Sequence, residues 1–375
     1  MKRLIALLIC FSMILSFYGC SGANNTTGGN EKSGTETESK TQTQTPVNSE
    51  KENKLSGKTL RVGTMPVALG LPVQYAYSKG WFEDAGLDVE IVLFASGAPI
   101  NEAMAAKELD MAVSGMASVY ALATGLYTYI GDGSITLHGE AIYARPDSDI
   151  VENKGVLDGT FGSAETVKGK SILGPLATTA HFMAIKYVES FGLTSDDFNM
   201  VSMEYAQAYQ AFIMGEGDLL ATKPPYTTQL EEAGYVQVCS IGAALGSSLV
   251  NANYVQNEIY EERYEDLKVF MDCYYRACEE LNNDPVTRKE FAMDWYAENG
   301  ITFSDSDMDS EIAGRAYPTL DILDSDEYPF GLTMTTIGEF FTTQGMINEE
   351  DLPNILNSIN NSIVKDLKKE RTGQS

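Results

Sequence analysis

Residues 79–118 alternate between short apolar runs and small polar turns, and this alternation constrains the fold more than any other feature of the chain. The run at 87–94 begins with alternating polarity and ends wholly apolar, as a strand buried on both faces of a sheet does. Ser96-Gly97-Ala98-Pro99 follows, with the small polar residue, glycine and proline that are typical of a helix start. A second short strand at 111–113 and the helix start Ser114-Gly115 complete a predicted α/β order of strand, helix, strand, helix.

Small polar residues recur in the turns that connect an expected strand to the following helix, at Ser96-Gly97, Ser114-Gly115 and Thr178-Thr179. In an open α/β sheet these points lie at the carboxyl ends of the strands, where ligands bind. A helix start also offers free backbone N–H groups. One such turn alone only reverses the chain, whereas its recurrence favours a binding site.

The same segment resembles a known family. Gly-Trp-Phe-Glu-Asp-Ala-Gly-Leu-Asp-Val-Glu at 80–90 and Glu-Leu-Asp-Met-Ala-Val-Ser-Gly at 108–115 are similar to the solute-binding components of ABC importers, in the group for sulfonates, taurine, nitrate and thiamine-pyrimidine precursors. The pattern continues at Lys168-Gly169-Lys170 and at Lys223-Pro224-Pro225. The resemblance implies a type II periplasmic-binding-protein fold, in which two α/β lobes close on a ligand in the cleft at the hinge.

The N-terminal residues predict export. A basic start and a short apolar run make 1–19 a secretory signal peptide. Cys20, after Gly19, stands where a bacterial lipoprotein is cleaved and lipidated, although Phe17 departs from that pattern. We expect Cys20 to anchor the chain to the membrane outside the cytoplasm; an ordinary secreted protein is the alternative. The rest of 20–56 is polar and predicts a disordered tether.

The repeated strand, turn and helix plan divides the remaining chain into two lobes. Lobe 1 is expected at 57–144 plus 250–375, and lobe 2 at 145–249. Two short strands are expected at 135–137 and 140–143. The C-terminal third is expected to form helices at 258–282, 285–298, 307–315, 335–344 and 352–369.

Composition excludes several function classes. The chain has 26 lysines and arginines against 53 aspartates and glutamates, so nucleic acid is not an expected partner. His138 and His181 are the only histidines, so a multi-histidine metal site is not expected. No cofactor is predicted either. Cys239, Cys273 and Cys278 are odd in number and irregularly spaced, which predicts buried thiols rather than a disulfide framework.

Carried over position by position, the resemblance implies a cleft lined by residues at strand ends and helix starts. These are Thr64, Met65, Ser96, Gly97, Ser114, Gly115, Thr178, Thr179, Lys223 and Pro224.

Several of these residues have alternative roles. Thr178 and Thr179 either cap their helix alone or also bind ligand. Lys223 either neutralises a ligand anion or is a surface lysine. Tyr205, Tyr209 and Tyr226 either stack on a flat ligand or pack within the lobe. His181 is expected to be structural.

The function that the resemblance implies is capture of a small solute by a monomeric, lipid-anchored protein, which delivers it to an ABC permease and its ATPase. Helix starts favour an oxyanion-bearing solute. The alternatives are a heteroaromatic thiamine or pyrimidine precursor and a ligand-sensing lipoprotein. An enzyme is disfavoured, because no Ser-His-Asp order or paired-carboxylate motif is recognisable. The dense cysteine motif of the thiamine-pyrimidine synthase that shares this fold is not found either.

Overall fold

Two mixed β-sheets organise the chain in the computed structural model, which describes residues 54–373 except 247, 324, 326 and 327. The expected signal peptide, Cys20 and most of the expected tether lie outside the described residues. None of the helices in the described ranges is both long enough and apolar enough to cross a membrane.

The six-stranded sheet contains the segment that the sequence singles out. Strands β1 (Leu60–Thr64), β2 (Val89–Leu93) and β3 (Met111–Ser114) run parallel to one another. Strand β10 (Leu249–Gln256) is antiparallel to β3, and β4 (Tyr127–Thr136) is antiparallel to β10. In order across the sheet the strands are β11 (Arg315–Ala316), β4 (Tyr127–Thr136), β10 (Leu249–Gln256), β3 (Met111–Ser114), β1 (Leu60–Thr64) and β2 (Val89–Leu93).

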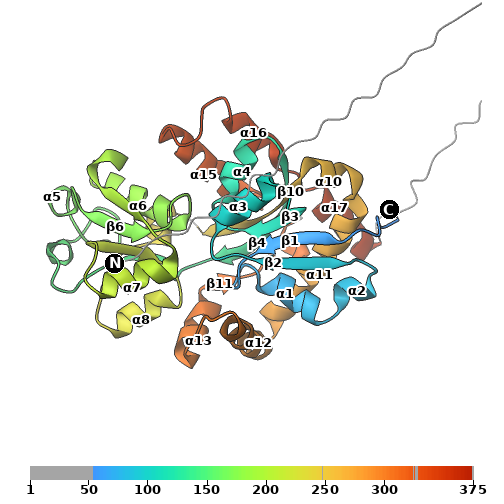
Figure 1. Ribbon diagram of the computed structural model, residues 1–375, viewed down its shortest axis with the longest axis horizontal. Helices are drawn as coiled ribbons and strands as arrows, with labels where there is room; N and C mark the ends of the chain where they lie inside the picture. The colour runs from blue at the N-terminus through green and yellow to red at the C-terminus, as the bar shows by residue number, and fades with distance from the viewer. Residues whose placement is uncertain (1–53, 247, 324, 326–327, 374–375) are drawn as a thin grey trace, which may run out of the picture. The chain divides into compact units, whose positions relative to one another are not determined.

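The five-stranded sheet repeats this plan. Its strands, in order, are β7 (Asn199–Ser202), β6 (Ser171–Gly174), β8 (Leu219–Thr222), β5 (Ala141–Ala144) and β9 (Val236–Ser240). Helices α6 (Thr179–Glu189) and α7 (Tyr205–Ile213) lie on opposite faces of this sheet (Figure 1). The remaining helical segments between β5 and β9 are η1 (Asp149–Glu152), α5 (Ala164–Val167), η2 (Ser195–Asp197) and α8 (Tyr226–Glu232).

The other helices precede β5 or follow β9. They are α1 (Leu71–Ser78), α2 (Trp81–Asp84), α3 (Gly97–Ala105), α4 (Ser118–Ala123), α9 (Ile241–Leu245), α10 (Asn257–Glu262), α11 (Tyr264–Asn283), α12 (Pro285–Glu298), α13 (Asp305–Ala313), α14 (Leu320–Leu323), α15 (Leu332–Thr343), α16 (Leu352–Ser358) and α17 (Ser362–Thr372).

The chain passes from one sheet to the other in two places. The first passage lies between Thr136 and Ala141, and the second lies between Ser240 and Leu249. The expected lobe 1 at 57–144 includes β5, which pairs with β8 and β9 inside the five-stranded sheet. We therefore place the first crossing before Ala141 and keep the division into two lobes as a proposal.

Strand β4 differs from its prediction, because one ten-residue strand stands where only a short strand at 135–137 was expected. Gly131 and Gly133 make this sequence look like a loop, yet Gly131 is required by packing. A Cβ atom at Gly131 would lie 2.5 Å from the Met271 Cε atom and 2.6 Å from the Tyr275 hydroxyl oxygen, both on α11. The glycine lets this helix pack directly on the sheet.

Two predicted long helices are each divided into two. The expected helix 258–282 breaks at Arg263, whose backbone leaves the helical region and whose side chain binds Asp266 and the Lys58 and Thr59 carbonyls. The expected helix 352–369 breaks at 359–361, where Ile359 bridges to Tyr129 of β4. In both places contacts with distant segments interrupt a locally helical sequence.

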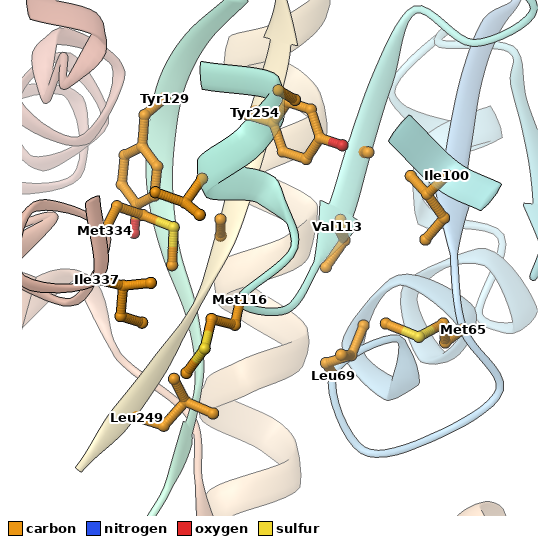
Figure 2. Close-up of a cluster of buried hydrophobic side chains, with 14 of the residues drawn as sticks. Met65, Leu69, Ile100, Val113, Met116, Tyr129, Leu249, Tyr254, Met334 and Ile337 are labelled. Carbon is orange, nitrogen blue, oxygen red and sulfur yellow. The ribbon is translucent and has the colours of Figure 1, made fainter. Parts of the chain in front are cut away.

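The main hydrophobic core is continuous between the two sheets. It combines side chains that flank β3 and β10 with the buried face of α6. Figure 2 shows part of it, with Met334 and Ile337 of α15 near Met116 and Leu249. A second, smaller cluster packs α7 on the other face of the five-stranded sheet.

Candidate functional site

One pocket brings together most of the residues that the sequence predicts for the cleft. Its lining includes Met65, Ser96, Gly97, Gly115, Thr178, Thr179, Lys223 and Pro224. Thr64 and Ser114, the last residues of β1 and β3, are fully buried and are not among its lining residues. The Thr64 hydroxyl instead donates a hydrogen bond of 3.0 Å to the Val113 carbonyl.

The pocket is built from the carboxyl end of β1 and from the starts of α3 and α6. Met65 follows β1, Ser96 is the N-cap residue of α3, and Thr178 is the N-cap residue of α6. This is the arrangement expected for an open α/β sheet, in which the strand ends and helix starts surround the ligand. Met65, Leu69 and Met116, labelled in Figure 2, give the pocket an apolar wall continuous with the core.

Neither helix start is capped by a side-chain hydrogen bond. The Thr178 hydroxyl donates to the Pro175 carbonyl at 2.8 Å, so the expected capping bond of Thr178 is wrong. The Ser96 hydroxyl donates to Glu204 Oε1 at 3.1 Å. Among the described residues, the Thr179 hydroxyl has no hydrogen-bond partner. The first turns of two helices and the free hydroxyl thus present hydrogen-bond donors at one pocket.

Lys223 lies at this pocket and is half-buried rather than a free surface lysine. Its Nζ atom lies 4.6 Å from the centre of the Tyr205 ring. Within the described ranges, the Lys223 ammonium group forms no hydrogen bond or ion pair, although the Lys223 carbonyl accepts a backbone hydrogen bond of 3.1 Å from the Tyr226 N–H group. Burial lowers the pKa of its ammonium group, against the opposing effect of nearby carboxylates such as Glu140. The ammonium group is therefore a cation without a partner of opposite charge.

A buried ion-pair cluster at the pocket is absent from the sequence prediction. Arg315 Nη2 lies 3.2 Å from Glu140 Oε1, and Arg315 Nε lies 3.3 Å from Glu311 Oε1. The Arg315 guanidinium also donates to the Thr136 hydroxyl. Burial opposes the charge of Arg315, but the two carboxylates outweigh it and raise the pKa of the guanidinium. Because two acids already neutralise it, Arg315 is not a free partner for an anion.

Sequence reasoning missed this cluster because its members come from distant segments. Glu140 precedes β5, whereas Glu311 and Arg315 belong to α13 and β11. The one local signal is an i,i+4 acid and base pair, Glu311 and Arg315, which usually marks an exposed helix face.

A second, outer pocket adjoins the first and shares Val67, Tyr205, Lys223 and Pro224 with it. Its lining is mainly apolar and includes Leu93, Phe94, Ile301 and Tyr226. The outer pocket measures about 390 Å³ and the inner one about 50 Å³. Since a water molecule needs about 10–15 Å³ by this measure, the inner pocket has room for a group of a few heavy atoms.

The three tyrosines singled out in the sequence have different positions. Tyr205 lines both pockets, and Tyr226 lines the outer one. Tyr209 lines neither of them and stacks on Tyr226, with ring centres 4.8 Å apart. Packing is therefore the observed role of Tyr209.

The remaining candidate residues are structural. The Nδ1 atom of His181 accepts a hydrogen bond of 3.3 Å from the Ala177 N–H group, and His181 lines neither pocket. Cys239, Cys273 and Cys278 are buried and free, which confirms the prediction of buried thiols. Burial raises the pKa of the Cys239 thiol to about 12. Within the described part of the chain, no three potential metal-ligating side chains are grouped.

The chain is similar in sequence to a known family and to two named bacterial proteins. A family model described as NMT1/THI5 like matches residues 70–288. A Brachyspira hyodysenteriae protein, named by inference as a periplasmic binding protein of an ABC transporter, is 29% identical over 297 residues, which are 78% of this chain and 85% of that protein. A Bacillus subtilis protein, named by inference as an aliphatic sulfonates-binding protein, is 24% identical over 212 residues, 55% of this chain and 60% of that protein.

Solved structures share the fold at low identity. The alkanesulfonate-binding protein SsuA from Xanthomonas axonopodis pv. citri, bound to MOPS, superposes with a TM-score of 0.63 at 16% identity and covers 81% of this chain and 98% of its own. The desulfurization enzyme DSZB superposes with a TM-score of 0.58 at 12% identity and covers 84% of this chain and 99% of its own. Binding proteins and an enzyme thus use the same architecture.

Proposed function

This chain belongs to the NMT1/THI5-like family and has the type II periplasmic-binding-protein fold that the sequence predicts, and on that premise we propose that it is the extracytoplasmic solute-binding component of an ABC importer. It captures a small oxyanion-bearing solute and delivers it to a permease and its ATPase. The relative from Brachyspira hyodysenteriae supports the transport role, and the sulfonate-binding relatives support an oxyanion as the solute's headgroup.

One observation carries this proposal: the uncapped starts of α3 and α6 meet at one pocket together with Lys223. Backbone N–H groups and helix dipoles stabilise negative charge, and an unpaired ammonium group adds to that effect. The inner pocket is the size of an oxyanion headgroup, and the apolar outer pocket suits the rest of an organic solute. Binding requires no catalytic step, and we propose none.

Binding can be tested by thermal unfolding of the purified protein with sulfonates, sulfate, nitrate and carboxylates. A solute at 100 times its dissociation constant stabilises a folded protein by about 2.7 kcal/mol. For a domain of this size we expect a rise in melting temperature of about 5–10 °C. Thr179→Ala and Lys223→Met should each remove much of that rise.

Lys365→Met provides the matched control, because Lys365 is exposed on α17, away from both pockets. It should keep the full ligand-induced rise. If no oxyanion stabilises the protein, or if Thr179→Ala and Lys223→Met bind as tightly as the unaltered protein, the site is assigned wrongly.

A heteroaromatic precursor of thiamine or pyrimidines is the second candidate solute, and the positions of Tyr205 and Tyr226 favour it. Flat rings stack on such side chains. The same thermal assay with pyrimidines separates this candidate from the first. The sequence further supports a lipid on Cys20 as the membrane anchor, and with it a position outside the cytoplasm.

A further inference from the structure

We propose that the ion-pair cluster of Glu140, Glu311 and Arg315 sets the charge of the solute, so that the pocket accepts an oxyanion with one negative charge and rejects one with two. This inference rests on the proposed function and deepens it, because it concerns the headgroup that the inner pocket takes. It follows from the balance of charges around that pocket.

The cluster holds one carboxylate more than Arg315 needs. Arg315 Nη2 lies 3.2 Å from Glu140 Oε1, and Arg315 Nε lies 3.3 Å from Glu311 Oε1. The exposed fractions of Glu140, Glu311 and Arg315 are 6%, 5% and 8%. Either acid alone would neutralise the guanidinium group, so the cluster carries an excess negative charge. A buried charge in excess is costly, and this one lies in the wall of the inner pocket.

The charges of the cluster act on the cation that the proposed function assigns to the solute. Lys223 lines the same pocket as the three residues of the cluster. Burial lowers the pKa of its ammonium group, Glu140 and Glu311 act to raise that pKa, and Arg315 acts to lower it. A solute anion bound beside this ammonium group is therefore exposed to the same charges.

The charges around the inner pocket match one negative charge on the solute. Its charged side chains are Glu140, Glu311, Lys223 and Arg315, with equal numbers of each sign. The starts of α3 and α6 add about half a positive charge each. One negative charge completes this balance, and a second meets the excess carboxylate. The outer pocket brings Glu204 as a further carboxylate and no further cation among the described residues.

Matched esters that differ by one charge test the inference. We would measure by calorimetry at pH 7.5 the affinities of methyl sulfate against methyl phosphate, of ethyl sulfate against ethyl phosphate, and of phenyl sulfate against phenyl phosphate. The two members of a pair have nearly the same shape. The sulfate ester carries one negative charge, whereas the phosphate ester, with a second pKa of about 6, carries mostly two.

The sulfate member of a bound pair should bind at least about tenfold more tightly, because the second charge of the phosphate ester is repelled in a site of low dielectric constant. The phosphate ester can take up a proton and bind as a monoanion. At pH 7.5 this limits the preference to about thirtyfold.

Glu311→Gln should reduce the preference to threefold or less. The variant removes the excess charge, keeps an oxygen atom that can accept the hydrogen bond from Arg315, and leaves Glu140 as the partner of the guanidinium group. Glu290→Gln is the matched control, because it removes one negative charge from an exposed position on α12 that lines neither pocket. It should keep the preference. The pairs also test the unaltered protein, so the result does not depend on how well Glu311→Gln folds.

The outcomes separate this inference from the proposed function. If the phosphate esters bind the unaltered protein as tightly as their sulfate partners, selection by charge is refuted while oxyanion binding stands. An unchanged preference in folded Glu311→Gln refutes the role of the cluster. If the folded protein binds no member of any pair, the oxyanion-binding function is refuted together with this inference.

Discussion

His181 holds the turn that precedes α6 and does so as a neutral side chain. Its Nδ1 atom accepts a hydrogen bond from Ala177, whose backbone has a φ angle of +56°, a conformation that alanine rarely adopts. Acceptance at Nδ1 requires an unprotonated nitrogen. Burial accordingly lowers the pKa of His181 from 6.5 to about 4. Protonation would break the contact that supports this turn.

The lowered pKa of His181 predicts a loss of stability in acid. Below pH 6.5 the unfolded chain binds a proton at this position, whereas the folded chain does so only near pH 4. The free energy of unfolding should therefore fall between pH 7 and 4.5, by about 2 kcal/mol from this group alone. Urea denaturation at the two pH values measures the fall.

Comparison of two histidine variants isolates this contribution. His181→Gln should show a smaller fall than the unaltered protein, while His138→Gln, which changes an exposed histidine, should show the same fall. Equal falls in all three proteins would show that His181 does not resist protonation.

The sequence predicts pocket-lining residues where one turn of chain determines their position, while their role in binding stays a prediction. Ser96 and Gly97 come shortly after β2, and Thr178 and Thr179 come shortly after β6, so their positions depend on local strand and helix order. Strand β2 itself is an edge strand with Leu93 exposed, so the expectation that it is buried on both faces is wrong. Glu204 and the Arg315 cluster depend instead on pairing between distant segments, such as the hydrogen bond from Ser96 to Glu204. Local sequence patterns do not predict side-chain contacts between segments that are far apart in the chain.

At the scale of elements, α6 and α15 form a contact between the two sheets. The rings of Phe182 on α6 and Phe340 on α15 meet edge to face, with centres 4.9 Å apart. The Lys186 Nζ atom lies 4.0 Å from the centre of the Phe340 ring. Gln344, just after α15, donates a hydrogen bond to Glu189. This contact adds to the two passages of the chain between the sheets.

A double-mutant cycle between Phe182 and Phe340 measures this contact in solution. Each change to alanine should lower the free energy of unfolding by about 3–5 kcal/mol, because both rings are buried. The double variant should lose less than the sum, with a coupling energy of about 0.5–1.5 kcal/mol for an aromatic pair.

Leu356→Ala, an exposed position on α16, is the control for this cycle and should change stability little. A coupling energy near zero, with all variants folded, would show that α6 and α15 are apart in the dominant solution state.

Predictions of elements succeed or fail for the same reason as predictions of residues. Helix α12 occupies 285–298 as expected, because its Asp284 N-cap and Pro285 are local signals. Strand β4 was missed because its glycine Gly131 is required for close packing of α11, which lies more than a hundred residues later in the chain. A local sequence pattern does not reveal that contact. The helix breaks at Arg263 and Ile359 likewise respond to contacts made elsewhere.

At the scale of the whole described unit, the continuous core argues against lobes that unfold independently. Side chains of α6 and of the six-stranded sheet belong to one buried cluster. Cooperative unfolding is expected where one core joins the parts. The expected closure around a solute then involves rearrangement at the α6 and α15 contact as well as at the two passages.

We predict a single unfolding transition. The two tryptophans of the chain, Trp81 and Trp295, lie on α2 and α12, which both pack on α11, the helix that covers β4 of the six-stranded sheet. Their fluorescence reports on that part, whereas far-ultraviolet circular dichroism reports on both sheets. The two urea transition curves should coincide. A fluorescence transition clearly displaced from the dichroism transition would show that the two sheets unfold separately.

The uncapped starts of α3 and α6 separate what is invariant in recognition from what can change. Their donors are backbone groups, which any sequence that forms these helices supplies. The outer pocket, in contrast, is built from side chains such as Leu93, Ile301 and Glu204. Under the proposed function, substitutions there alter which solute body is accepted and leave the site for its negative charge in place. Related proteins that keep these two helix starts can thus come to bind different solutes through substitutions in the outer pocket alone, with the fold unchanged.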